Sequence, residues 1–293
     1  GNSEINLEIS MMLDVTGSMA WDSGDGTIKI DALKAAAKEL IDILIPASGK
    51  SHARIGLAPF SSRVNLGDYA MAVTGEPATK TVTSTYQCNK KESCTQVCTR
   101  YRKNGECRDW DEQCTYTYDT CTSESTNYLY RCMTERTGTE AFKDTAPTSG
   151  FAASWKSSES SAINCTPNST YAVMGMSTNA KALKDRIEAF DTGGATAGHL
   201  GVAWAWYLLS PNWSGVFSGD STPKAYGTAK NKKIAVLMTD GQFNTYYASG
   251  QGDSVAQAKS LCDAMKAANV GIEIYTIGFK LDDPDAAAVL QYC

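Results

Sequence analysis

The segment Asp14-Val15-Thr16-Gly17-Ser18 presents a carboxylate and two hydroxyls at alternate positions. Gly17 lets the backbone turn tightly between the two hydroxyl-bearing residues. Carboxylate and hydroxyl oxygens are the donors that a small hard cation such as Mg²⁺ prefers, so Asp14, Thr16 and Ser18 are candidate metal ligands. A strand end followed by a helix N-cap would contain the same residues, and the motif alone leaves this alternative open.

Two later segments place further oxygen donors at the boundaries of predicted elements. Thr196 lies in a glycine-rich loop, 192–198, that opens a predicted helix. Asp240 directly follows an apolar strand predicted at 232–239. Ligands of open α/β sheets bind beyond the carboxyl ends of the strands, which is where Asp14 and Asp240 lie. We therefore expect the three segments to contribute to one metal site.

Apolar runs and helical periodicity alternate along most of the chain. Strands that alternate with amphipathic helices are typical of a doubly wound α/β fold, with a mostly parallel sheet flanked by helices. The predicted strands lie at 5–13, 54–60, 232–239 and 271–279, and the predicted helices lie at 28–44, 179–190, 198–209 and 255–269, with a last helix beginning near 285.

The composition changes in the middle of the chain. The only Val, Leu or Ile residues between 86 and 165 are Val97, Leu129 and Ile163. Such a segment cannot build an ordinary aliphatic core and needs disulfides to stay folded. We predict that 75–176 forms a cysteine-rich, disulfide-stapled lobe inserted into a domain made of 1–74 and 177–293. The aromatic residues of the lobe would form its packing or binding surface.

Ten cysteines are present, eight of them between 88 and 165 and the others at Cys262 and Cys293. The even number fits disulfides formed in an oxidising compartment. Zinc binding is the competing explanation, but the cysteine-rich segment has no Cys-x2-Cys pair and no histidine. Because the eight lie apart in sequence from the other two, we expect them to pair among themselves and Cys262 to pair with Cys293. The sequence leaves the connectivity of the eight open.

Charge and composition argue against several functions. The net charge of −5, with a pI of about 5.2, disfavours a broad nucleic-acid-binding surface. A transmembrane helix needs about 18 consecutive apolar residues, and this sequence contains no such run. The glycine-rich loop lacks the lysine of a Walker motif, and no Ser-His-Asp or Cys-His set is apparent, so we expect no enzymatic activity. His199, at a helix N-terminus, is expected to be a pocket or packing residue.

The segments around Asp14, Thr196 and Asp240 resemble the metal-ion-dependent adhesion site of the von Willebrand factor type A family. The resemblance covers 5–73 and 178–293, and it implies a von Willebrand factor A-like fold that holds one divalent cation, with Mg²⁺ preferred over Ca²⁺ or Mn²⁺. In this family the metal binds an acidic side chain of a protein partner, which implies adhesion rather than catalysis. The implied metal ligands are Asp14, Thr16, Ser18, Thr196 and Asp240. Family members often have Thr directly after the paired glycines, whereas this chain has Ala195 between the glycines and Thr196.

A narrower resemblance connects the chain to the TadG-like proteins of the bacterial tight-adherence (Tad) pilus system. Such proteins carry an N-terminal membrane anchor before a type A domain exposed outside the inner membrane. The resemblance implies an extracytoplasmic location, in the periplasm or at the cell surface, and an anchor upstream of Gly1. It also implies partners among pilus or cell-envelope components, and a role in pilus assembly or surface attachment. The segments that carry it are 14–19, 201–206, 237–244 and 274–279, together with Cys262 and Cys293.

The cysteine-rich insertion supports an alternative function. In this alternative the type A domain is a structural scaffold, and the insertion, 75–176, is the element that binds the partner.

Overall fold

A computed structural model describes residues 4–49, 51–75, 80–127, 132–147, 153–154 and 169–293. The chain divides into two compact units, which are treated separately below. Unit 1 comprises 1–78 and 128–293, and unit 2 comprises 79–127. Among the described residues, no helix combines the length and the apolar content that crossing a bilayer requires.

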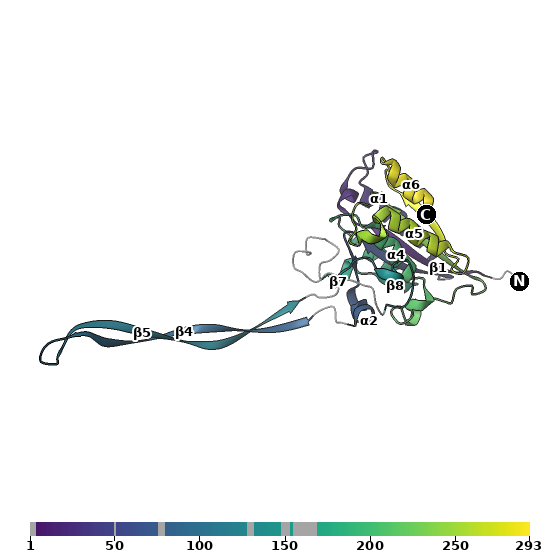
Figure 1. Ribbon diagram of the computed structural model, residues 1–293. Helices are drawn as coiled ribbons and strands as arrows, with labels where there is room; N and C mark the ends of the chain where they lie inside the picture. Colours follow the sequence, from purple (N-terminus) through teal and green to yellow (C-terminus); the bar gives the residue numbers. More distant parts are fainter. Residues whose placement is uncertain (1–3, 50, 76–79, 128–131, 148–152, 155–168) are drawn as a thin grey trace. The chain divides into compact units, whose positions relative to one another are not determined.

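Unit 1 is built on a central five-stranded sheet (Figure 1). Four of its strands are parallel, and β8 at one edge runs antiparallel to β2. The mostly parallel α/β sheet expected from the sequence is therefore confirmed. In the order β10-β9-β1-β2-β8, the strands are β10 (Glu273–Gly278), β9 (Asn231–Thr239), β1 (Asn6–Asp14), β2 (Ala53–Phe60) and β8 (Met174–Ser177).

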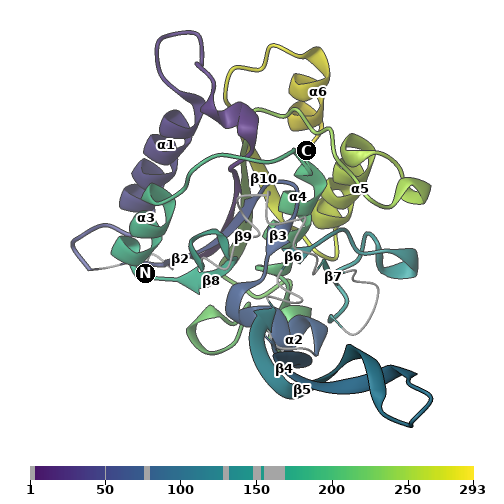
Figure 2. The same cartoon turned by 90° about the vertical axis from the view of Figure 1, so that its left-hand side faces the viewer.

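Helices cover both faces of this sheet (Figure 2). Consecutive residues of β1 supply two separate cores, because side chains alternate across a strand. Met12 packs with the helices of one face, and Met11 and Leu13 pack with those of the other. The first face carries α4 (Gly198–Tyr207), α5 (Ser254–Lys266) and α6 (Pro284–Tyr292), and the second carries α1 (Lys29–Leu44) and α3 (Ala180–Glu188).

The helix α4 is buried on every side, so it has no exposed face. Trp206 and Tyr207 are only 2% and 1% exposed, because the segment that follows the helix folds over it. Trp213 from that segment stacks on Tyr207, with ring centroids 4.2 Å apart, and Trp206 donates a hydrogen bond to the Tyr226 hydroxyl. Aromatic burial of this kind contributes a large apolar contact area.

Shorter elements complete unit 1. A three-stranded sheet has the order β3-β6-β7, and a short helix, α2, follows its first strand. These elements are β3 (Val64–Asn65), α2 (Ala70–Thr74), β6 (Cys132–Met133) and β7 (Ala153–Ser154), and the 3-10 helices are η1 (Gly17–Ala20), η2 (Gly67–Tyr69), η3 (Gly138–Glu140), η6 (Ser169–Tyr171), η7 (Pro211–Trp213), η8 (Gly219–Ser221) and η9 (Ser249–Gln251).

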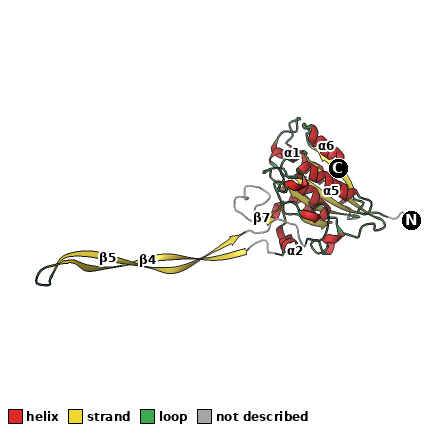
Figure 3. Cartoon of the chain, in the orientation of Figure 1, coloured by secondary structure: helices red, strands yellow, loops and turns green. Residues whose placement is uncertain are grey.

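Unit 2 is a long antiparallel hairpin of β4 (Lys80–Tyr101) and β5 (Cys107–Asn127) (Figure 3). None of the side chains described between 81 and 126 is buried, so the hairpin has no core. A two-stranded hairpin without a core is marginally stable in water. The cross-strand disulfides Cys88–Cys121, Cys94–Cys114 and Cys98–Cys107 supply the missing constraint.

The hairpin is shorter than the insertion expected at 75–176. Several residues of that range belong to unit 1, because they carry the apolar side chains that 81–126 lacks. Met133, Tyr171 and Val173 are at most 4% exposed and pack into the cores of unit 1.

The expected partition of the cysteines holds wherever the structure describes both partners. Cys262 in α5 is bonded to Cys293 at the end of the chain, as expected. Cys132 is also disulfide-bonded, and no cysteine among the described residues is free. Cys165 lies outside the described residues.

The two classes of disulfide should have different effects on stability. Replacing Cys262 and Cys293 by serine opens a long loop in unit 1, and we expect the free energy of unfolding to fall by about 3 kcal/mol in the chain-entropy model. Replacing Cys94 and Cys114 should instead accelerate hydrogen exchange in the hairpin and leave the urea midpoint of unit 1 unchanged. A lower midpoint in the Cys94/Cys114 variant would show that the hairpin contributes to the stability of unit 1.

Candidate metal centre

Asp14 is the last residue of β1, and its side chain is fully buried. Both carboxylate oxygens accept hydrogen bonds from hydroxyl groups. The Thr16 hydroxyl donates to Oδ1 at 2.6 Å, and the Thr16 backbone N–H donates to the same oxygen at 2.9 Å. The Thr239 hydroxyl donates to Oδ2 at 2.7 Å. Asp14 is therefore held in one orientation by Thr16, which follows the same strand, and by Thr239, which ends the neighbouring strand β9.

Asp240 follows β9 and is also fully buried. Its Oδ2 accepts a hydrogen bond from the Ser18 hydroxyl at 2.5 Å. The Ser18 and Thr16 hydroxyls lie 3.3 Å apart, which links the surroundings of Asp240 to those of Asp14. Four of the five residues expected to bind metal thus form one continuous cluster of hydrogen-bonded oxygens.

Thr196, the fifth expected ligand, lies in the loop before α4 and is 3% exposed. Within the described part of the chain, its hydroxyl makes no hydrogen bond to the other four residues. The loop itself lies against the first segment, because the Gly17 N–H donates to the Gly194 carbonyl and the Gly193 N–H donates to the Val15 carbonyl, both at 2.9 Å. The backbone thus brings the two loops together, while the Thr196 hydroxyl stays outside the cluster.

Gly194 makes this close approach of the two loops possible. Its φ of +85° lies in the left-handed region, which residues with a side chain rarely adopt. A Cβ at this position would also lie 2.4 Å from the Ser61 hydroxyl oxygen. The second glycine of the pair is therefore required by conformation and by space.

Lys29 is a third charged residue of the centre, and its place there was not evident from the sequence. It is the first residue of α1 and only 2% exposed, and its ammonium lies 3.2 Å from Asp240 Oδ2. A positive charge at the first position of a helix opposes the helix dipole. That unfavourable position was the available signal that an acidic group holds Lys29 there.

The electrostatics leave the centre one positive charge short of neutrality when both carboxylates are ionised. Burial, and after it the neighbouring charge of Asp240, raise the pKa of Asp14 from its ordinary value of 3.8 to about 6, although the hydrogen bonds from Thr16 and Thr239 act in the opposite direction. Lys29 is the only cation that contacts the pair within the described residues. The two carboxylates and the nearby hydroxyls are all hard oxygen donors, which fit Mg²⁺, Ca²⁺ or Mn²⁺.

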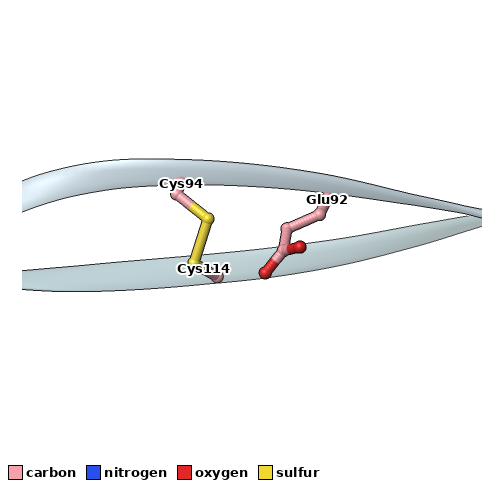
Figure 4. Close-up of side chains that lie close together, drawn as sticks. All are labelled: Glu92, Cys94 and Cys114. Atoms are coloured by element: carbon pink, nitrogen blue, oxygen red, sulfur yellow. A yellow bond between two sulfur atoms is a disulfide. The ribbon is translucent and has the colours of Figure 1, made fainter.

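A second group of potential metal ligands lies in the hairpin, where Glu92 is close to Cys94 and Cys114 (Figure 4). The two sulfurs are bonded to each other, so neither is a thiolate that could bind metal. The group is exposed and is explained by the cross-strand disulfide.

His199 takes part in a buried network that the sequence did not reveal. Its Nδ1 lies 2.8 Å from the Ser254 hydroxyl, and its Nε2 pairs with Glu135, which also accepts a hydrogen bond from the Tyr247 N–H at 3.1 Å. Ser254, His199 and Glu135 are 1%, 1% and 6% exposed, so Ser254 is inaccessible to a substrate in this conformation. The network connects the starts of α4 and α5 to the segment that returns from the hairpin.

One cavity of unit 1 lies away from the candidate metal centre. It has a volume of about 420 Å³ and is lined by residues at the start of β9 and before β10, among them Asn231, Lys233 and Gly271. Asp240 lies at the opposite end of β9. This cavity is therefore not part of the candidate centre.

Comparisons with known proteins give distant structural similarities only. No protein-family model matches the chain, and no curated protein matches it. The PilB minor pilin from Streptococcus sanguinis is 12% identical over 100% of this chain and 55% of that chain, with a TM-score of 0.42. The pilus adhesin SpaC from Lactobacillus rhamnosus GG is 14% identical over 100% of this chain and 27% of that chain, with a TM-score of 0.43.

A third similar structure is the adhesive tip pilin from Group B Streptococcus agalactiae. It is 12% identical over 80% of this chain and 46% of that chain, with a TM-score of 0.36. The chain therefore spans between about a quarter and about half of the length of these three proteins.

The raised pKa of Asp14 predicts how the metal-free protein responds to pH. A folded-state pKa of about 6 against 3.8 when unfolded means that ionisation of Asp14 destabilises the fold as the pH rises through this window. In metal-free buffer we expect Asp14→Asn to be more stable than the wild type at pH 7.5, by up to about 3 kcal/mol. The difference should shrink towards pH 4, where the wild-type carboxyl is protonated in the folded state.

Urea unfolding of both proteins at the two pH values measures this difference. A stability difference between Asp14→Asn and the wild type that does not depend on pH would contradict the raised pKa.

Proposed function

We propose that the chain is an extracytoplasmic, metal-dependent protein-binding module that acts in pilus assembly or surface attachment. The observation that carries the proposal is the burial of Asp14 and Asp240 in one cluster of hydroxyl oxygens, with Lys29 as the only contacting cation among the described residues. Two buried carboxylates are costly unless cations compensate them. A divalent cation would supply the compensation that one ammonium does not.

The centre would hold one divalent cation, with Mg²⁺ preferred over Ca²⁺ or Mn²⁺. The proposed ligands are Asp14, Thr16, Ser18, Thr196 and Asp240. Bound there, the cation would supply a Lewis-acidic position that a carboxylate of the partner completes. The hydroxyls of Thr16 and Ser18 now donate to the carboxylates, and rotation about their side-chain bonds would present their oxygen lone pairs to the metal instead.

The surrounding side chains of the centre would position the two acids. Thr239 holds Asp14 through Oδ2, and Lys29 holds Asp240. Asn244 fixes the loop of Thr196, because its side chain accepts a hydrogen bond from the Thr196 N–H at 3.1 Å and its own N–H donates to the Thr196 carbonyl at 2.9 Å. Orientation by such outer contacts is typical of metal sites.

The von Willebrand factor type A resemblance supports the proposal through its three motifs, because the segments that carry them lie near one another beyond the carboxyl ends of β1 and β9. The disulfides fit an oxidising location outside the cytoplasm. The resemblance to TadG-like proteins supports the more specific role in a pilus system, with an anchor upstream of Gly1 and partners in the cell envelope.

A second function rests on a separate observation, the exposed aromatic residues of the hairpin. Large exposed aromatic side chains without a core to fill are typical of binding surfaces. In this alternative unit 1 is a scaffold, and the hairpin carries partner choice. The exposed aromatic residues are Tyr86, Tyr101, Trp110, Tyr116 and Tyr118.

Metal binding is tested by titrating Mg²⁺ and Mn²⁺ into the purified chain in a calorimeter. We expect Asp14→Ala to weaken the affinity by more than about tenfold, because losing even an outer contact of a metal site costs that much. Asp31→Ala is the matched control, since Asp31 is an exposed aspartate at the start of α1. Equal affinities of Asp14→Ala and the wild type would refute the ligand assignment.

Capture of partners from a cell-envelope extract separates the two functions. The bait proteins are the wild type, Asp14→Ala, and a variant with 79–127 replaced by a Gly/Ser linker. We expect the linker variant to keep its metal affinity, because all five proposed ligands lie in unit 1. Capture that is lost with chelator and with Asp14→Ala supports the metal centre, whereas capture that is lost only in the linker variant assigns partner choice to the hairpin.

A further inference from the structure

Among the described residues, the two strands of the hairpin each have a single neighbour, so each has one unpaired edge. An unpaired edge presents a row of backbone N–H and C=O groups that can bind another strand. The edges of β4 and β5 differ in regularity and in charge, and these differences determine which of them can accept a strand.

The edge of β4 is interrupted at two positions. The register shifts between Cys88 and Lys91 and again between Cys98 and Arg100, and each shift leaves one extra residue on β4. Bulges combined with lysine residues are a common way of protecting an edge from further pairing. Lys90 lies within the first bulge. The edge of β4 is therefore poorly suited to accept a strand.

The edge of β5 is regular from 109 to 127, where β5 has no extra residue against β4. Cys94 and Cys114 face each other with a Cα–Cα distance of 4.0 Å. This distance is characteristic of a non-hydrogen-bonded pair, in which both backbone groups point away from the partner strand. The N–H and C=O groups of Cys114 therefore face the free edge, and by alternation so do those of Glu112 and Tyr116.

The charge of β5 indicates what kind of strand fits this edge. β5 contains five acidic residues and one arginine, whereas β4 contains four basic residues and one glutamate. Two of the acids already have partners, because Asp109 pairs with Arg100 and Asp119 pairs with Lys91. The other three have no ion-pair partner among the described residues. These are Asp111, Glu112 and Glu124.

Aromatic side chains on β5 add to this preference for positive charge. Trp110 and Tyr116 are 60% and 47% exposed. The Lys90 ammonium lies 3.8 Å from the centre of the Tyr116 ring, which shows that these rings accept a cation. A lysine or arginine on an added strand would find similar cation–π contacts along β5.

A second copy of the chain is a poor match for this edge. Pairing β5 with β5 would place like charges opposite each other, which is unfavourable. Pairing β4 of one copy with β5 of another would match the charges but would meet both bulges of β4. The occupant that satisfies charge and regularity is a different, uninterrupted basic strand.

We propose that the free edge of β5, 109–127, binds an extended, positively charged segment of a partner protein as an added strand. The main-chain hydrogen bonds supply the affinity, and the unpaired acids and exposed rings select for Lys and Arg. This interaction does not use the metal centre, so it can be tested separately from metal-dependent binding.

The test uses the full chain and two fluorescent peptides of about ten residues, a typical strand length. One peptide alternates Thr with Lys, and the other alternates Thr with Glu. We expect fluorescence anisotropy to show binding of the Thr/Lys peptide and none of the Thr/Glu peptide. Chelator should leave the affinity unchanged. Equal binding of both peptides would overturn the proposal.

Variants of Tyr116 distinguish strand addition from simple charge attraction. Tyr116→Pro removes an N–H that faces the free edge and is not used by the β4–β5 ladder. We expect Tyr116→Pro to weaken peptide binding about tenfold, because it removes one main-chain hydrogen bond to the peptide and disturbs the adjacent ones. Tyr116→Thr also loses the ring but keeps the N–H, so it should weaken binding less. Equal effects of the two variants would overturn strand addition.

Charge reversal keeps the proposal testable if proline disturbs the hairpin. Asp111→Lys on β5 should weaken binding of the Thr/Lys peptide, whereas Glu92→Lys, the same charge change on β4, should have a smaller effect. Equal losses in these two variants would overturn the assignment to the β5 edge. Sedimentation that shows dimers of the wild type but not of Tyr116→Pro would also overturn it, because the occupant would then be a second copy.

Discussion

Two carboxylates are buried at neighbouring strand ends, and the local structure of unit 1 follows from the need to compensate them. β1 and β9 pair in parallel with Leu13 opposite Met238, so Asp14 at the end of β1 lies near Thr239, and Asp240 follows directly after β9. Their mutual repulsion adds to the cost of burial that raises the pKa of Asp14. Hydroxyls and the Lys29 ammonium offset part of this cost, which explains why polar side chains occupy a fully buried edge.

The chain combines two different solutions to the problem of stability. Unit 1 buries apolar side chains on both faces of a sheet, and a helix as apolar as α4 is buried on all sides. The hairpin buries none of its described side chains and relies on covalent links between its strands. The two cores of unit 1 contain no residue of 81–126, so unit 1 does not need the hairpin for its cores.

Much of the fold could be predicted because apolar periodicity reports burial directly. β1, β9 and α1 lie within one residue of the predicted ranges, and α5 ends three residues before the predicted end. The hairpin could not be predicted in this way, because both of its faces are exposed and its Thr-rich strands have no apolar alternation. The burial of Trp206 and Tyr207 could not be predicted from the helix alone, since the segment that covers them comes from later in the chain.

The sequence alone determined the order of the main helices and of most sheet strands in unit 1, the division of most cysteines into two groups, and the candidate donors Asp14, Thr16, Ser18 and Asp240, since these depend on local pattern and chemistry. Only the tertiary structure decided which donors meet, because contact between residues more than two hundred positions apart depends on strand order. It showed Thr196 to be held by Asn244, Lys29 to be the cation beside Asp240, and His199 to be paired with Glu135. No local pattern encodes these three contacts, because each joins residues that are far apart in the sequence and that only the folded chain brings together.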